Sequence, residues 1–260
     1  MGKNFPLKQA NMNPDTVGNL LDIIASEIPS KEAIKYPALG LSFTYGEFNK
    51  LCQKVGKAII ALGVEDGEHI AIWAPNIPEW LLLQFGAPKA SAVLVPINTC
   101  YCIQELRYIL QNSEVTMLFL ATGPKYPHKY SDVVYELCPE LGECEPGKLL
   151  SKTLPKLTTV INIGEENLPG MLNWNDFLAM ADQLEDYKLL ERQSKVSPDD
   201  VLLIQYTSGT TGVSKGVMLT HNNVLDNATI CGQRIGITSS DKACNVLPFF
   251  HCSGYTSTTL

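Results

Sequence analysis

The stretch 206–216, which reads Tyr-Thr-Ser-Gly-Thr-Thr-Gly-Val-Ser-Lys-Gly, constrains this chain more than any other part of its sequence. It follows directly on the apolar run 201–204, which has the composition of a buried strand. Glycines let backbone amides approach an anion closely, hydroxyls donate hydrogen bonds, and Lys215 adds a compact positive charge. An apolar strand that ends in such a loop is suited to phosphate, so we expect the loop to bind a polyphosphate.

Two common phosphate loops do not fit this stretch. A Walker A loop needs Gly before its lysine and Ser or Thr after it, whereas Lys215 is preceded by Ser214 and followed by Gly216. The dinucleotide fingerprint Gly-x-Gly-x-x-Gly is also missing, because neither Gly209 nor Gly212 has a glycine two residues earlier. A flexible Ser/Thr/Gly linker is the remaining alternative, and the apolar runs on both sides of the stretch argue against it.

The hydrophobic pattern before the loop alternates between the periods of helices and strands. Apolar residues at 48, 51, 52, 55, 58, 59 and 62 line one face of a helix that ends at Gly63. We expect strands at 69–73, 93–95 and 115–120, and helices at 80–90 and 103–110, the first of them begun by a capping box of Asn76 and Glu79. This order predicts an α/β fold, in which helices flank parallel sheets.

The flanking regions complete one predicted unit that spans residues 1–260. We expect a helix at 17–28 capped by Asp15 or Thr16, two short strands at 33–36 and 41–44, and a helix from 221 to about 232 capped by Thr220. The middle, 123–170, is irregular because prolines interrupt it, with a helix at 130–137 and a strand at 159–163, and a helix at 174–181 follows. Its aromatic cluster is interpreted as loop packing rather than a ligand surface; the members are Tyr126, His128, Tyr130 and Tyr135.

Composition excludes several classes of protein. The hydrophobic content of 45% is that of a globular chain, and the net charge of -7 argues against general affinity for nucleic acid or anionic membranes. The first 14 residues lack the apolar core of a secretory signal, and no run approaches the roughly 18 to 20 apolar residues of a membrane span. The eight cysteines lack paired Cys-x2-Cys spacing. We therefore expect a cytoplasmic protein with reduced thiols and no metal site of its own.

The loop sequence resembles that of the adenylate-forming, or AMP-binding, enzymes, whose signature reads Tyr/Phe-Thr-Ser-Gly-Ser/Thr-Thr-Gly-x-Pro-Lys-Gly. One position departs from it, since Ser214 replaces the usual proline, which makes the loop more mobile without removing a donor. The segment 245–254 resembles the family's Pro-Leu-Phe-His-x-x-Gly run, with Phe249 in place of leucine and His251 as the histidine. Segments 42–48, 76–80 and 96–106 resemble further family motifs, so the resemblance covers most of the chain.

The resemblance implies that residues 1–260 form the N-terminal portion of the large AMP-binding domain, without the small C-terminal domain. It also implies an acid–CoA ligase that uses ATP, Mg2+ and coenzyme A to convert a carboxylate into an acyl-adenylate and then a thioester. Lys215 and His251 would be catalytic, with His251 orienting the carboxylate or gating access. The nucleotide would be bound by Thr207, Ser208, Gly209, Thr210, Thr211, Gly212, Val213, Ser214 and Lys215.

Several alternatives stay open at this point. The stretch 139–174 resembles medium-chain fatty acyl-CoA ligases, although the acyl chain, oligomeric state and thiol acceptor are not fixed. The family's adenine, ribose and hinge motifs are not found before Leu260, so we expect little or no ligase activity from the chain alone. A carrier-loading adenylation module, a luciferase-like oxidoreductase and a non-catalytic nucleotide-binding fragment are the rival functions. We expect His221 to make local hydrogen bonds rather than act in catalysis, and Cys252 not to be a nucleophile.

Overall fold

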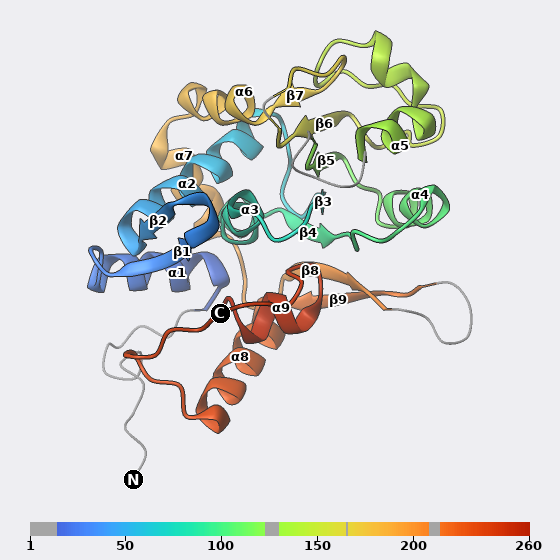
Figure 1. The fold of residues 1–260 in the computed structure, drawn as a ribbon. Coiled ribbons are helices and arrows are strands. Elements are labelled where there is room, and N and C mark those ends of the chain that lie inside the picture. Colours follow the sequence, from blue (N-terminus) through green and yellow to red (C-terminus); the bar gives the residue numbers. More distant parts are fainter. Residues whose placement is uncertain (1–14, 123–129, 165, 208–213) are drawn as a thin grey trace.

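The computed structural model describes residues 15–122, 130–164, 166–207 and 214–260. These residues form a seven-stranded sheet with the strand order β7-β6-β5-β3-β4-β8-β9, and a separate two-stranded sheet (Figure 1). The strands are β1 Glu32–Tyr36, β2 Leu41–Thr44, β3 His69–Trp73, β4 Val93–Pro96, β5 Met117–Leu120, β6 Thr159–Asn162, β7 Leu172–Asn173, β8 Val201–Tyr206 and β9 Gly216–Thr220.

Helices connect the strands and cover the large sheet. Because β4 and β5 lie on opposite sides of β3, right-handed crossovers place the connecting helices α3 and α4 on opposite faces (Figure 1). The helices are α1 Val17–Glu27, α2 Tyr45–Ala61, α3 Pro78–Lys89, α4 Ile103–Asn112, α5 Tyr130–Leu137, α6 Trp174–Ala179, α7 Asp186–Ser194, α8 His221–Ile235 and α9 Cys252–Ser257. Short 3-10 turns lie at Pro37–Leu39, Pro139–Glu143 and Met180–Gln183.

The strand pairing confirms the predicted fold class. β3 pairs in parallel with β4 and β5, β5 with β6, and β4 with β8, so the sheet is parallel up to β8. Only the last pairing, β8 with β9, is antiparallel within this sheet as described. Strands β4, β5 and β6 are buried at every residue, as expected when helices cover both faces of a parallel sheet.

Helix α3 lies at the centre of the core. All but one of its residues are buried, and Trp80 is fully enclosed. The helix approaches α2 so closely at Gly86 that an added Cβ would lie 2.7 Å from a methyl carbon of Val55 and 2.8 Å from the Cys52 carbonyl oxygen. Glycine is therefore required at position 86, because any side chain would push the two helices apart.

A buried ion pair joins α3 to the N-terminal helix α1. The ammonium group of Lys89, which is 0% exposed, lies 2.8 Å from Asp22 Oδ1 and donates to the Gly18 carbonyl oxygen at 3.0 Å. Asn49 from α2 and Gln193 from α7 also donate to the Asp22 carboxylate, at 2.8 and 2.7 Å. Burial alone would raise the pKa of Asp22, but Lys89 and these donors hold it below its usual value. Burial lowers the pKa of Lys89.

Some sequence predictions at element ends were wrong. Ile77 rather than Asn76 is the N-cap residue of α3 and makes no side-chain capping bond, because Pro78 takes the first helical position. Helix α8 continues past 232 and ends at Gly236, whose φ of 78° is left-handed. No strand precedes His251 within the described residues 245–250, although this segment is largely apolar in sequence, and Val246 is 82% exposed. Helix α7 and strand β7 were not predicted.

The predicted helix caps and the aromatic cluster can be compared with the structure directly. Thr16 caps α1, accepting from the Asn19 N–H, and Thr220 caps α8. In the aromatic cluster, Tyr130 packs on Trp73 with ring centroids 4.2 Å apart, and the Tyr135 hydroxyl donates to the Pro169 carbonyl oxygen, which supports the packing interpretation. Tyr126 and His128 lie outside the described residues. No helix of the described ranges is both long and apolar enough to cross a bilayer.

Candidate functional site

The candidate loop connects β8 to β9 at the carboxyl edge of the parallel strands. β8 runs parallel to β4, with Leu203 paired to Leu94, and ends at Tyr206, which pairs with Gly216 as the chain returns in β9. The chain therefore leaves the sheet after Tyr206, where the parallel strands end, and re-enters it at Gly216. In open α/β sheets ligands bind outside the carboxyl ends of the strands, so the loop has the position that a binding site requires.

The two ends of the loop are hydrogen-bonded to each other. The Thr207 N–H donates to the Lys215 carbonyl oxygen at 3.0 Å, and the Lys215 N–H donates to Thr207 Oγ1 at 3.3 Å. Lys215 is exposed, and its ammonium group has no hydrogen-bond or ion-pair partner among the described residues. It is therefore available to an anion. Ser214 is half-buried, while the other predicted loop residues lie outside the described residues; they are Ser208, Gly209, Thr210, Thr211, Gly212 and Val213.

Tyr206 fixes the end of β8 to helix α4 and its C-cap residue Ser113. Its hydroxyl accepts a hydrogen bond from Asn112 Nδ2 at 2.8 Å and lies 2.7 Å from Ser113 Oγ. The ring of Tyr108 meets that of Tyr206 edge-on, with centroids 6.2 Å apart. The loop thus begins from a strand end that is held by a buried aromatic side chain. No local sequence pattern points to these partners, since they lie more than 90 residues away along the chain.

His251 is the N-cap residue of α9 and is exposed. Its Nδ1 accepts from the Ser253 N–H at 3.3 Å and lies 2.8 Å from Ser253 Oγ. These contacts leave Nε2 on the outer side of the ring, where it has no hydrogen-bond partner in the described part of the chain. Cys252 Sγ lies 3.6 Å from Nδ1. The histidine therefore offers one ring nitrogen to a ligand.

Gln205 brings His251 and the loop to one edge of the sheet. Its Nε2 donates to the Phe250 carbonyl oxygen at 2.9 Å. Gln205 stands two residues before Thr207, and Phe250 stands immediately before His251. The two segments that resemble family motifs, far apart in sequence, are therefore joined directly in the fold.

The segment before His251 is also fastened to α3. Asn76 Nδ2 donates to the Leu247 carbonyl oxygen, and Asn76 Oδ1 accepts from the Phe249 N–H, both at 2.8 Å. Phe249 packs on Trp80 with ring centroids 5.5 Å apart. Sequence reasoning assigned Asn76 to a capping box and so missed this role. The substitution of Phe249 for the family's leucine puts an aromatic ring against Trp80.

Helix α9 rests on the same helix α3 through Gln84. Its side-chain amide donates to the Tyr255 carbonyl oxygen at 3.1 Å and to Thr259 Oγ1 at 2.6 Å. An added Cβ at Gly254 would lie 2.0 Å from the Pro248 carbonyl oxygen, so only glycine fits where α9 crosses its own entering segment. His251 is thus supported on both sides by contacts with rigid core elements.

His221 takes part in a different contact, at the other end of the β8–β9 hairpin. It is 2% exposed, and its Nδ1 accepts from the Val17 N–H at 3.1 Å. Burial lowers the pKa of His221 to about 4, and the nearby Asp200 carboxylate opposes this shift. The expectation of local hydrogen bonding was wrong for the His221 side chain, because its partner lies 204 residues away in the sequence.

Comparison with known proteins finds relatives over most of this chain. YngI of Bacillus subtilis (strain 168), whose name assigns it provisionally as an acyl-CoA synthetase, is 42% identical over 248 residues, which are 94% of this chain and 44% of YngI. The mitochondrial medium-chain acyl-CoA ligase ACSF2 of Danio rerio is 34% identical over 245 residues, 94% of this chain and 40% of the relative. The chain therefore spans less than half the length of these curated relatives.

A solved structure shares the fold. The N-terminal domain of FACL13 from Mycobacterium tuberculosis matches with a TM-score of 0.73 at 23% identity, over 95% of this chain and 54% of that one. The family model described as AMP-binding enzyme matches residues 21–260, which include the β8–β9 loop, Lys215 and His251. On this match, the chain belongs to the AMP-binding enzyme family.

Proposed function

We propose that this chain is part of an ATP-dependent acid–CoA ligase, which converts a carboxylic acid into an acyl-adenylate and then into an acyl-CoA thioester. The observation that carries the proposal is the hydrogen bond from Gln205 to the Phe250 carbonyl oxygen. It joins the strand that leads into a free lysine and a hydroxyl-rich loop to the segment that presents His251. A cation for phosphate and an imidazole for the acid thereby meet at one edge of the sheet.

The first half-reaction is a displacement at phosphorus. A carboxylate oxygen attacks the α-phosphorus of ATP, the bond from that phosphorus to the bridging oxygen breaks, and pyrophosphate leaves with the electron pair. In the second half-reaction a thiol attacks the acyl carbon and AMP leaves, while the thiol proton passes to solvent or a base. Both steps place negative charge on a leaving group, so donors that stabilise that charge lower the barrier.

Lys215 is assigned to the phosphate groups of ATP. Its ammonium group is exposed and free of protein partners in the described residues, and its backbone is held against Thr207 at the loop base. The Thr207 hydroxyl accepts the Lys215 N–H and can still donate its own proton to a phosphate oxygen. Mg2+ would arrive bound to the triphosphate, since Mg2+ retains water ligands and is commonly held through substrate phosphates.

His251 is assigned to the acid. With Nδ1 turned to Ser253, the neutral ring that accepts there carries its proton on Nε2, which can donate to a carboxylate oxygen. Such a bond would hold the acid in line with the α-phosphorus, and its benefit is orientation rather than proton transfer. A medium-chain aliphatic acid is the proposed substrate class, because ACSF2 carries that specificity in its name and is 34% identical to this chain.

Calorimetry with MgATP tests the nucleotide half of the proposal. We expect the chain to bind MgATP and the variant Lys215→Ala to bind it at least about tenfold more weakly, because one charge-assisted contact is lost. Lys242→Ala is the matched control, since Lys242 is an exposed lysine whose ion pair is to Glu32, away from the loop. Equal affinities for Lys215→Ala and the original chain would contradict the assignment. A carboxylic-acid panel in pyrophosphate exchange with the intact ligase then tests the substrate class.

A further inference from the structure

A cavity lies at the amino edge of the sheet, away from the candidate active site. It is lined by the first residues of three parallel strands, His69 of β3, Val93 of β4 and Val201 of β8, and has a volume of about 340 Å3. The candidate loop leaves the other end of β8, six residues further along the chain. The cavity is therefore separate from the loop and from His251.

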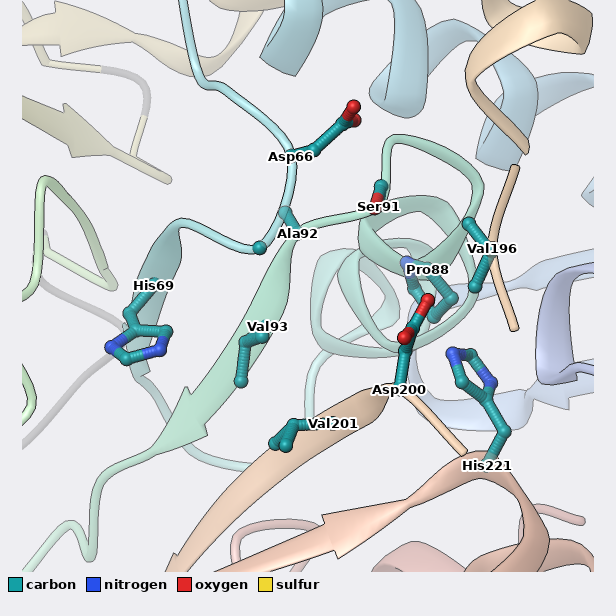
Figure 2. Close-up of a pocket in the computed structure, with 11 residues that line it drawn as sticks. Asp66, His69, Pro88, Ser91, Ala92, Val93, Val196, Asp200, Val201 and His221 are labelled. Atoms are coloured by element: carbon teal, nitrogen blue, oxygen red, sulfur yellow. The ribbon is translucent and has the colours of Figure 1, made fainter. Parts of the chain in front are cut away.

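Two polar side chains face each other across this cavity. Figure 2 shows the Asp200 carboxylate beside the His221 ring, with one ring nitrogen turned toward the carboxylate. Among the described residues no ion pair within 4.0 Å joins the two side chains. Their backbones are joined, since the backbone N–H of His221 donates to the Asp200 carbonyl oxygen at 3.3 Å. The two side chains line the same cavity and do not satisfy each other.

The hydrogen-bonding role of each group is fixed by its other partner. His221 Nδ1 accepts from the Val17 N–H at 3.1 Å, and burial keeps the ring neutral, so its proton is on Nε2. Nε2 is thus a donor without a partner in the described part of the chain, on a side chain that is 2% exposed. Asp200 Oδ2 accepts from the Ser197 N–H at 2.7 Å, which leaves the other carboxylate oxygen as an acceptor.

Besides this donor and acceptor, the polar side chains of Asp66, His69 and Ser91 line the cavity, and the rest of its side chains are apolar. Pro88, Ala92, Val93, Val196 and Val201 line the cavity (Figure 2). A small cavity with apolar walls and a few convergent polar groups is the usual form of a small-molecule site. A cavity of roughly 150 Å3 can hold a benzene ring, so this one has room for a ring and a polar substituent.

We propose that this cavity binds a small molecule that carries a primary carboxamide on an apolar ring. The amide oxygen accepts from His221 Nε2–H, and the amide N–H donates to the Asp200 carboxylate. A carboxylate in the same place would satisfy His221 but would meet the negative charge of Asp200. An amidinium would satisfy Asp200 but would turn an N–H toward the N–H of His221. Of these three groups, the amide alone matches both side chains.

Three probes of the same shape test this match, namely benzamide, benzoate and benzamidine, titrated into the 260-residue chain labelled at its valine methyl groups for NMR. We expect saturable shifts of the Val93, Val196 and Val201 methyls with benzamide, and at least about tenfold weaker binding of the other two, because each has one mismatched hydrogen bond. Equal shifts with all three probes, or none with benzamide up to its solubility limit, would overturn the proposal. The second result would mean that the cavity holds water only.

Variants of residues that line the cavity distinguish a loss of binding at this site from a general loss of folding. Val196→Phe fills the cavity and is expected to abolish the benzamide shifts, whereas Val217→Phe, the same change on exposed β9, is expected to keep them. Asp200→Asn retains an oxygen for the Ser197 N–H and turns an N–H2 donor toward the cavity. The pair of donors then matches a carboxylate, so we expect the preference to change from benzamide to benzoate. An Asp200→Asn chain that still prefers benzamide would refute the assigned contacts.

Discussion

The side-chain oxygen of Asn76 accepts a hydrogen bond from the Phe249 N–H at 2.8 Å, across 173 residues of sequence. Its amide nitrogen donates to the Leu247 carbonyl oxygen at the same distance. One side chain at the entrance of α3 therefore satisfies the backbone on both sides of Pro248. This contact fixes the segment that carries His251, which has no strand partner in the described residues to hold it.

Replacement of Asn76 by alanine is expected to loosen this segment. Two hydrogen bonds are lost, at a cost of about 1–2 kcal/mol in the free energy of unfolding. Hydrogen exchange at the Phe249 amide should become faster, because its acceptor is gone. Asn222→Ala is the matched control, since Asn222 makes one exposed side-chain bond, to Asp199. Unchanged exchange at Phe249 in Asn76→Ala would show that the segment is held by packing instead.

The sequence predicted the central fold because its periodic segments are long and their partners follow in order. The sequence could not reveal the role of the Asn76 side chain. A capping interpretation uses only residues within one helical turn, whereas the hydrogen-bond partners of Asn76 are 171 and 173 residues away. Helix α7 was missed because Leu189 and Gln193 are its buried residues, which is too weak a stripe to detect. The loop was placed from local composition. The proximity of His251 to it was implied only by family resemblance, because no local pattern encodes the Gln205 bond.

Gln205→Leu tests whether that bond positions His251. The change removes the donor to the Phe250 carbonyl oxygen but keeps the side chain's size. In the intact ligase we expect the pyrophosphate-exchange rate to fall about tenfold or more, since a small misplacement of an orienting group is costly. MgATP affinity should change less than about twofold, because Lys215 and Thr207 are untouched.

The control for this change is Gln111→Leu, which removes a similar bond, to the Thr153 carbonyl oxygen at 2.8 Å. That bond is exposed and involves neither the loop nor the segment of His251, so the exchange rate is expected to remain near the original. If Gln205→Leu weakens MgATP binding as much as it slows exchange, the bond supports the loop rather than His251.

Asp22→Ala is expected to lower the free energy of unfolding strongly. It leaves the Lys89 ammonium group buried without its counter-ion, at a cost of roughly 3–5 kcal/mol in urea denaturation. Asp186→Ala provides the comparison, because Asp186 also pairs with a lysine, Lys57, but its side chain is 90% exposed. We expect Asp186→Ala to change the free energy of unfolding little, because most exposed ion pairs contribute little to stability. Similar losses in the two variants would mean that burial does not decide the strength of the Lys89 pair.

The buried His221 ring predicts a specific loss of stability in mild acid. Its pKa is about 4 in the folded chain because burial disfavours the charged ring, and about 6.5 in the unfolded chain. Well above pH 6.5 the His221 ring is unprotonated in both the folded and the unfolded state, so it contributes no pH dependence to the free energy of unfolding. As the pH falls from 6.5 toward 4, the unfolded state binds a proton that the folded state does not. The free energy of unfolding should therefore fall by about 2–3 kcal/mol between pH 7 and pH 4.5.

His221→Asn isolates this effect from the carboxylates that titrate in the same range. The asparagine oxygen can still accept from the Val17 N–H, but the side chain cannot take up a proton in this range. We expect the variant to be less stable than the original chain at pH 7, because it fills less of the space beside Val17. The deficit should shrink by about 2–3 kcal/mol at pH 4.5, since only the original chain carries the penalty. Urea denaturation of both chains at the two pH values measures the difference, and a deficit that stays constant would mean that His221 is already protonated in the folded chain or equally shielded in the unfolded one.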